Sequence, residues 1–416
     1  MTPTPRLAVA LAAISVAAIA LPLWICGVAA LILVGAGLAD ACYVRKRPDA
    51  QLTLPKLIAR GVPADFALTL GALPAGATAR VRQPLPPDVG LTPSTGAGDL
   101  IGHIVAKRRG RHVLPKPAIR VEGPLRLGAW THRIGDETEV VVYPDVYGAA
   151  RIAAAVRSGR FQDASGAHRG PIGLGTEFES IRDYQPDDDI RQVNWLATAR
   201  SGRTMSNTYR LDQDRTVVCL VDAGRLMAAP IDGRTRLDAA IDAAIAVASC
   251  ADEVGDAIGA LAFDGEIRRQ VSQTRRGSRN VIQALFDLEP SMLESDYELA
   301  FRSIGSTKRS LVVVFTDLLD DSAARTLIDA VPVVARRHAV IIASVIDADL
   351  HDLLRRPPQS TADAAEQAAA ADLIERRLLA VSTLRRAGAV VIEAEADALP
   401  TATVSAYLRL KRAARI

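Results

Sequence analysis

The stretch that decides the fold is TVVCLVD, residues 216–222. Its Val, Cys and Leu residues follow one another without a polar interruption, which is typical of a strand that other elements cover on both faces. The same pattern recurs at residues 257–263, 310–316, 339–346 and 389–393. Segments with helical patterning follow these strands, at residues 236–252, 278–288, 322–336, 362–387 and 401–414. This alternation of strands and helices predicts a doubly wound, mainly parallel sheet over residues 215–416.

Upstream of this α/β domain, residues 48–145 favour a different architecture. The candidate strands are short, and Pro and Gly separate them at spacings typical of a small antiparallel β-sandwich. We expect these strands at residues 65–70, 79–81, 100–107, 110–113, 118–122 and 137–142. Residues 146–214 then form a linker region, which opens with a helix at residues 149–158.

The N-terminal segment is the most apolar part of the chain. No charged residue occurs in residues 7–39. As a single helix, the apolar run to Tyr43 would be roughly 55 Å long, whereas the core of a bilayer is about 30 Å thick. Two short helices therefore fit a membrane better than one long helix.

A break in the apolar run supports this division. Pro22 lies near its middle, and Trp24 suits a membrane–water boundary. We expect a transmembrane helical hairpin, residues 7–21 and 23–44, in an anchor at residues 1–47. The basic cluster RKR at residues 45–47 predicts that everything after it stays in the cytoplasm, by the positive-inside rule. A single span, a re-entrant piece and a cleaved signal peptide are the alternatives.

The composition narrows the possible functions. The formal net charge is +3, acidic and basic residues are interspersed, and aromatic residues make up only 4% of the chain, so we expect no nucleic-acid partner. None of the four cysteines lies in a C-x-x-C motif. We interpret them as buried, reduced thiols, which agrees with cytoplasmic domains: Cys26, Cys42, Cys219 and Cys250.

Two of the predicted strands end in a carboxylate, at Asp222 and Asp317. In a doubly wound sheet, ligands bind at the carboxyl ends of the strands. Ser295 lies in a loop between the two residues in sequence. This layout resembles a von Willebrand factor A domain, a Rossmann-like fold. There, a D-x-S-x-S motif, a Thr and an Asp hold a magnesium ion that can accept a partner's carboxylate.

The present chain departs from that motif. Gly224 and Leu226 replace both of its hydroxyl residues, and Arg225 brings its own cation to the same loop. We therefore expect a metal-free, partner-binding surface of the same shape and no cofactor. Weak magnesium binding is the alternative. The residues of this predicted surface are Asp222, Arg225, Ser295 and Asp317.

A longer motif lies in the linker region. It reads E-F-x-x-x-R-x-Y-x-P-x-D-D-x-R-x-x-x-W-x-x-x-A-R and begins at Glu177. With the segments RRG at 108–110, GPLRL at 123–127 and VYP at 142–144, it resembles the family called domain of unknown function 58. The resemblance extends over nearly the whole chain, and an N-terminal membrane hairpin belongs to the family's usual layout. Asp187 departs from the glycine that the family usually has.

The resemblance implies a role as an adaptor or co-chaperone. Members of the family are thought to assist MoxR-type AAA+ ATPases in maturing or remodelling protein complexes, and no catalytic residue is established for them. The motif offers bidentate Arg–carboxylate pairs and a large apolar anchor. It either clasps the linker onto the α/β domain or forms a docking surface for the ATPase. A catalytic carboxylate pair is the third possibility. The motif's candidate residues are Arg182, Asp188, Asp189, Arg191, Trp195 and Arg200.

The chain carries no sequence motif of a common enzyme. None of its six histidines lies in H-E-x-x-H, and neither a phosphate-binding G-x-x-x-x-G-K-[ST] loop nor G-x-S-x-G occurs. We therefore expect no enzymatic activity. Two other interpretations stay open: a metal-dependent ligand receptor of the adhesion type, and an envelope hydrolase that uses Asp188 or Asp189.

Overall fold

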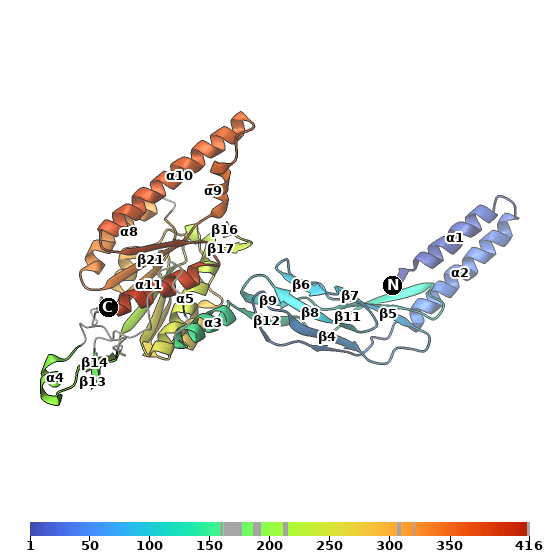
Figure 1. Cartoon of the computed structure of the whole chain (residues 1–416). Helices are drawn as coiled ribbons and strands as arrows, with labels where there is room; N and C mark the ends of the chain where they lie inside the picture. Colours follow the sequence, from blue (N-terminus) through green and yellow to red (C-terminus); the bar gives the residue numbers. More distant parts are fainter. Residues whose placement is uncertain are drawn as a thin grey trace. The chain divides into compact units, whose positions relative to one another are not determined.

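The chain divides into two compact units, Met1–Tyr143 and Pro144–Ile416. The computed structural model describes residues 1–158, 161, 177–185, 193–210, 215–305, 309–318 and 321–413. Each unit has a hydrophobic core of its own, and Figure 1 follows the chain through both.

The second unit is built on a six-stranded sheet in the order β19-β18-β15-β20-β21-β22. All neighbouring strands are parallel except β19, which pairs with β18 in antiparallel fashion at one edge. The five predicted strands of the α/β region are confirmed, whereas β19 was not expected because its sequence is half polar. The strands are β15 (Thr216–Asp222), β18 (Ala257–Phe263), β19 (Ile267–Arg275), β20 (Leu311–Phe315), β21 (Ala339–Val345) and β22 (Val390–Ala394).

Helices cover both faces of this sheet, as Figure 1 shows. Successive residues of a strand point to opposite faces, so Cys219 packs in one apolar cluster and Leu220 in the other. This two-sided burial explains why TVVCLVD is apolar throughout. One face carries α3 (Val146–Arg157), α5 (Arg236–Val254), α6 (Ser278–Leu285) and α11 (Leu399–Arg412). The other carries α7 (Tyr297–Arg302), α8 (Asp321–Ala335) and α10 (Thr361–Arg386), and α9 (Ala348–Arg355) precedes α10.

Helix α5 is the central helix of its face. It is rich in alanine, and its small side chains allow the sheet, α3 and α11 to approach closely. A capping box begins it, in which Thr235 and Asp238 each accept a hydrogen bond from the other's backbone N–H. Because α3 packs on α5, the first helix of the predicted linker region belongs to the second unit.

The first unit contains three small sheets, in the orders β1-β11-β10-β5-β7, β2-β4-β8-β6 and β3-β12-β9. All six predicted strands are present, but β3 pairs with β12 in parallel, whereas we expected antiparallel pairing throughout. The short strands β1, β2, β3, β6, β7 and β11 were not predicted. The bounds are β1 (Thr2–Pro3), β2 (Ala50–Thr53), β3 (Leu57–Ala59), β4 (Ala64–Leu70), β5 (Thr78–Arg82), β6 (Val89–Thr92), β7 (Thr95–Ala97), β8 (Leu100–Ala106), β9 (Gly110–Leu114), β10 (Ala118–Glu122), β11 (Gly128–Arg133) and β12 (Thr138–Tyr143).

Two apolar helices, α1 (Pro5–Ala17) and α2 (Leu23–Tyr43), form a hairpin that projects from one end of these sheets (Figure 1). Pro22 is the N-cap of α2, so the predicted break lies where the sequence placed it. Helix α2 has 21 residues and a mean hydropathy of 2.1, which makes it long and apolar enough to cross a membrane. Helix α1 has 13 residues and ends four residues before the predicted position, so it is shorter than a usual span.

A buried carboxylate joins the hairpin to the sheets. Asp40, near the end of α2, accepts hydrogen bonds from the backbone N–H groups of Leu125, Leu127 and Gly128 at 3.0, 2.9 and 3.0 Å. A Cβ at Gly123 would lie 2.1 Å from an oxygen of the same carboxylate. The segment GPLRL at 123–127 is therefore the loop that encloses Asp40.

All four cysteines are free thiols. Cys26, Cys219 and Cys250 are buried as predicted, whereas Cys42 is exposed and corrects that prediction. Burial raises the pKa of Cys219 and Cys250 to about 12, so both stay protonated at neutral pH.

Candidate functional site

The carboxyl edge of the six-stranded sheet contains a buried carboxylate, Asp222, at the end of β15. Its side chain is only 2% exposed. Oδ1 accepts hydrogen bonds from Gly224 N at 2.8 Å and from Ser295 Oγ at 2.5 Å. Oδ2 accepts hydrogen bonds from the hydroxyls of Tyr297 at 2.9 Å and Thr316 at 2.6 Å. Asp222 and Ser295, two residues of the predicted surface, are therefore in direct contact, and the hydroxyls of Tyr297 and Thr316 complete the set of donors.

Gly224 explains why the first hydroxyl of the D-x-S-x-S motif is missing. A Cβ at this position would lie 2.1 Å from Ser295 Oγ and 2.9 Å from the carbonyl oxygen of Leu293. The hydroxyl that meets Asp222 thus comes from the loop after residue 289, and only glycine leaves space for it. Gly224 stands in place of the motif's serine because the Ser295 hydroxyl occupies the space that a serine side chain would need.

Tyr297 closes the inner side of this site. It is 2% exposed, and its ring stands edge-on to Phe263 with the centroids 5.6 Å apart. Burial, and then the charge of Asp222, raise the pKa of the tyrosine well above its usual value. Tyr297 therefore keeps its phenolic proton, which it can donate to the carboxylate.

Asp317, the second predicted carboxylate, has a different environment. It is 2% exposed and its Oδ2 is bonded by the Arg236 guanidinium from the first turn of α5. Its Oδ1 accepts a hydrogen bond from Leu318 N at 2.8 Å and lies 3.7 Å from Arg377 Nη1 of α10. Arg377 also binds Glu393 at 2.7 Å. Asp222 and Asp317 therefore belong to two separate networks.

Charge in the second network is balanced by several partners. Arg236 is 4% exposed, and its Nη2 lies 3.9 Å from Asp347 as well. Burial, and then the neighbouring Arg377, lower the pKa of Arg236 to about 10, so it remains cationic at neutral pH. It supplies the positive charge that Asp317 requires in the interior.

The two networks do not fit a divalent cation. Magnesium requires several oxygen ligands with free lone pairs directed at one point. Here, N–H and O–H donors bind both oxygens of Asp222, and guanidinium groups meet Asp317. In the described part of the chain, no group of three or more His, Cys, Asp or Glu residues is placed to hold a metal.

An exposed loop covers Asp222 on the solvent side. We call residues 291–296 the edge loop. Ser291 N donates to the Ala223 carbonyl at 2.7 Å, and Arg225 N donates to the Leu293 carbonyl at 2.9 Å. These backbone bonds hold the loop against the turn that follows β15. The loop is therefore held by Ala223 and Arg225, the residues on either side of Gly224, which donates to Asp222.

The edge loop presents apolar side chains to solvent. Met292 is 80% exposed and Leu293 is 55% exposed. Beside them, Arg225 Nε donates to Glu294 Oε1 at 2.9 Å. Arg225 is thus at the surface, as predicted, but a carboxylate within the same unit already pairs with it.

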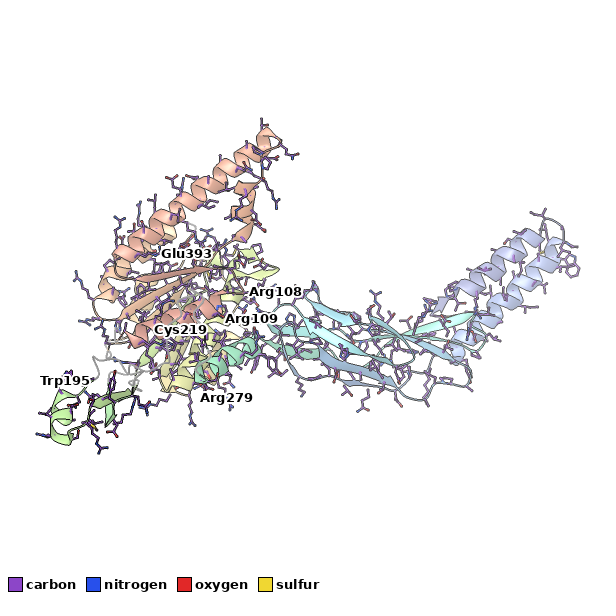
Figure 2. The ribbon with its side chains drawn as sticks, viewed as in Figure 1. Arg108, Arg109, Trp195, Cys219, Arg279 and Glu393 are labelled. Atoms are coloured by element: carbon purple, nitrogen blue, oxygen red, sulfur yellow. The ribbon has the colours of Figure 1, made fainter. Side chains whose placement is uncertain are left out.

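The linker motif forms a small separate element. Strands β13 (Glu177–Asp183) and β14 (Met205–Arg210) are antiparallel, and α4 (Trp195–Ser201) lies between them in sequence (Figure 2). Trp195 is 69% exposed, although a residue that clasps the linker onto the domain should be buried. Arg182 and Arg200 are exposed too. Three of the predicted site residues lie outside the described residues: Asp188, Asp189 and Arg191.

Tyr297, Thr316, Arg236 and Arg377 are site residues that were not predicted. Two of them had a signal in the sequence: Tyr297 follows Ser295 by two positions, and Thr316 directly precedes Asp317. Arg236 opens a predicted helix and Arg377 lies inside another, where a charged residue usually faces solvent. Only the folded chain shows that both side chains point inward.

A family model matches part of the chain. Residues 180–369 match the family described as "Protein of unknown function DUF58". The predicted resemblance is confirmed over this stretch, whereas we expected it over nearly the whole chain, and residues 1–179 and 370–416 lie outside the match.

Uncharacterized proteins of Mycobacterium bovis and Mycobacterium tuberculosis are 28% identical to this chain over 193 residues. That alignment covers 44% of this chain and 59% of each relative, so the chain spans under two thirds of their length. Among solved structures, a cohesin module from a Clostridium perfringens family 33 glycoside hydrolase matches with a TM-score of 0.14 and 9% identity. It covers 23% of this chain and 96% of the module. A likeness at this level carries no argument.

Proposed function

We propose that this protein is a membrane-anchored protein-interaction module without enzymatic activity. In this proposal its second unit is a von Willebrand factor A-like domain whose carboxyl edge docks a protein partner. The observation that carries the proposal is the edge loop, which presents Met292 and Leu293 on a backbone held over the buried Asp222. A rigid apolar pair within a polar rim is a common centre for a protein interface.

The role of the predicted carboxylates changes in this proposal. Asp222 and Asp317 are buried and bonded, so they position the surface and do not touch the partner. The contacts available to a partner come from Met292, Leu293 and the Arg225–Glu294 pair. Trp195, Arg182 and Arg200 form a second exposed group that suits docking better than clasping.

The partner that we propose is a MoxR-type AAA+ ATPase. This assignment follows from the resemblance to the DUF58 family, and the match over residues 180–369 supports the resemblance. The proposed task is that of an adaptor or co-chaperone in the assembly or remodelling of protein complexes. Protein donors already bind the carboxylates of Asp222 and Asp317, which argues against a metal-dependent adhesion receptor.

We also propose that the hairpin of α1 and α2 anchors the protein in the cell membrane and that both units face the cytoplasm. Helix α2 is apolar and long enough to span a bilayer. The basic cluster at 45–47 follows it directly, which favours the cytoplasmic side for this end. The Asp40 contacts attach the anchor to the first unit.

The test is a binding assay between the detergent-solubilised full chain and the MoxR-type ATPase of the same host, with ATP hydrolysis blocked. Burying a Met or Leu side chain stabilises a complex by about 1.5–3 kcal/mol. We therefore expect M292S/L293S to weaken binding by roughly tenfold or more. The matched control is L378S/L379S, which removes two leucines that are 60 and 61% exposed on α10.

The two parts of this proposal fail in different ways. If the wild-type chain does not bind the ATPase in any nucleotide state, the partner assignment is wrong. If the control pair weakens binding as much as the edge-loop pair, the partner stands but the docking surface lies elsewhere.

A further inference from the structure

The outer face of the five-stranded sheet in the first unit is strongly basic. Directly opposite residues of neighbouring strands share one face of a sheet. Arg80 lies opposite Arg120, and Arg82 and Arg133 both lie opposite Ala118. The alternate residues, such as Val81 and Ile119, are buried in the core. The arginines therefore point to solvent.

These charges are poorly neutralised by the protein itself. On the paired residues of this face, Glu122 is the one carboxylate, and it lies 3.6 Å from Arg120 Nε. Among the described residues, no carboxylate pairs with Arg80, Arg82 or Arg133. Like charges directly opposite each other in a sheet are destabilising. Glu122 offsets part of the charge of Arg120, and no carboxylate among the described residues pairs with Arg80, so the Arg80–Arg120 pair keeps a net positive charge.

A cavity connects this pair to the base of the apolar hairpin. Its volume is about 430 Å³, and its lining residues are Pro3, Thr4, Pro5, Ala8, Arg80, Arg120 and Glu122. Arg120 Nη2 donates to the Pro3 carbonyl at 3.4 Å, so the arginine is held beside the start of α1. Helix α1 carries no charged residue after Arg6, its second residue. Arg120 and the start of the apolar helix α1 therefore lie next to each other, at the end of the sheets from which the hairpin projects in Figure 1.

We infer that this cavity binds the phosphate of an anionic phospholipid headgroup between Arg80 and Arg120, with an acyl chain lying along α1. The inference rests on the proposed membrane anchoring. It follows because a hairpin in the bilayer places its base at the level of the headgroups, which is where a lipid phosphate lies. Guanidinium groups bind phosphate oxygens in bidentate geometry. Arg82 and Arg133 extend the same positive surface further from the membrane.

The experiment is native mass spectrometry of the full chain in detergent, titrated with phosphatidylglycerol or with phosphatidylcholine. We expect a 1:1 adduct with phosphatidylglycerol and little adduct with phosphatidylcholine. A basic residue near an anionic lipid surface contributes roughly fivefold in affinity. R80Q/R120Q should therefore weaken the phosphatidylglycerol adduct by roughly twenty-five-fold. The control, R269Q/R275Q, removes two arginines from β19 in the second unit and should leave the adduct unchanged.

Thermal unfolding gives a second readout that does not depend on detecting the adduct. Phosphatidylglycerol should raise the Tm of the wild-type chain more than that of R80Q, because R80Q loses one of the two arginines that meet the phosphate. Arg80 is exposed, so the substitution itself should not disturb the core. Without lipid, R80Q should be at least as stable as the wild type, since the repulsion with Arg120 is gone.

Three outcomes would overturn the inference. Equal adducts with both lipids would remove the selectivity for anionic headgroups, and an unchanged adduct in R80Q/R120Q would place the site elsewhere. Displacement of phosphatidylglycerol by an equal concentration of inorganic phosphate would show a phosphate site that ignores the acyl chain. The anchoring proposal fails by a separate result. In that case the chain would stay monodisperse in buffer without detergent, and it would enter the aqueous phase in a Triton X-114 phase separation.

Discussion

The hydroxyl of Tyr297 donates a hydrogen bond of 2.9 Å to Asp222 in the core of the second unit. The two residues are 75 positions apart in the sequence. A buried carboxylate requires such donors, because its charge is otherwise costly in a medium of low polarity. With Ser295 and Thr316, the tyrosine makes Asp222 a fixed point under the edge loop.

Removing this donor should destabilise the second unit. We expect Tyr297→Phe to lower the free energy of unfolding by about 2 kcal/mol, because a hydrogen bond to a buried charged group is lost without replacement. Urea unfolding followed by circular dichroism measures this difference. Tyr147→Phe is the control, since Tyr147 is 65% exposed. Equal effects of the two substitutions would contradict a special role for Tyr297.

The pair Arg236–Asp317 should behave as a coupled unit. Either Arg236→Met or Asp317→Leu alone leaves a buried charge without its main partner and should cost about 3–5 kcal/mol. The double variant R236M/D317L should cost clearly less than the sum of the two, because both charges are removed together. A double-mutant cycle from urea unfolding measures the coupling. Strict additivity would show that the two side chains do not interact in solution.

Glycine at position 224 should be required by the packing around Ser295. Gly224→Ser brings a Cβ to within 2.1 Å of Ser295 Oγ and should destabilise the unit by about 1–3 kcal/mol. G224S/S295G should recover much of this loss, because the clashing hydroxyl is gone.

Magnesium should not stabilise this site. We expect 10 mM MgCl₂ to shift the Tm of neither the wild type nor G224S, since Asp317 stays bonded to Arg236 in both proteins. A magnesium-dependent rise in the Tm of the wild type would restore the metal-site interpretation.

Stability should fall at mildly acidic pH through His338. Its Nδ1 accepts a hydrogen bond from Ser310 N at 3.2 Å, and burial, Arg337 and Arg309 lower its pKa below the usual 6.5. The unfolded chain therefore binds a proton first as the pH falls. The contribution of His338 is present above about pH 6.5 and is lost below it. Urea unfolding at pH 7 and pH 5.5 should show a smaller difference in H338N than in the wild type, and an equal difference would exclude this histidine as the cause.

The Asp40 contacts should protect three backbone amides. In Asp40→Ala, hydrogen exchange at Leu125, Leu127 and Gly128 should become faster, because these N–H groups lose their acceptor. Asp136→Ala is the control, since the Asp136 side chain is 99% exposed. Unchanged exchange in D40A would mean that the loop at 123–128 holds its shape without the carboxylate.

Much of the fold could be predicted from local patterns. The strand at 216–222 and its relatives were recognisable because a strand buried on both faces must be apolar throughout. The break at Pro22 was recognisable because proline ends helices in a predictable way. Strands β19 and β11 were missed because they are half exposed, and their polar residues hide the strand pattern. The parallel pairing of β3 with β12 depends on a partner more than 80 positions away and leaves no local signal.

The sequence by itself therefore determined the five parallel strands of the second unit and their order along the chain, the apolar hairpin and the two carboxylates at the ends of β15 and β20. Only the tertiary structure decided what those carboxylates bind: Asp222 meets the hydroxyls of Ser295, Tyr297 and Thr316, and Asp317 meets Arg236 and Arg377. The physical reason is distance along the chain. Periodicity reports which face of an element is buried, whereas the partner of a buried charge comes from another element and is known only when the packing brings the two together.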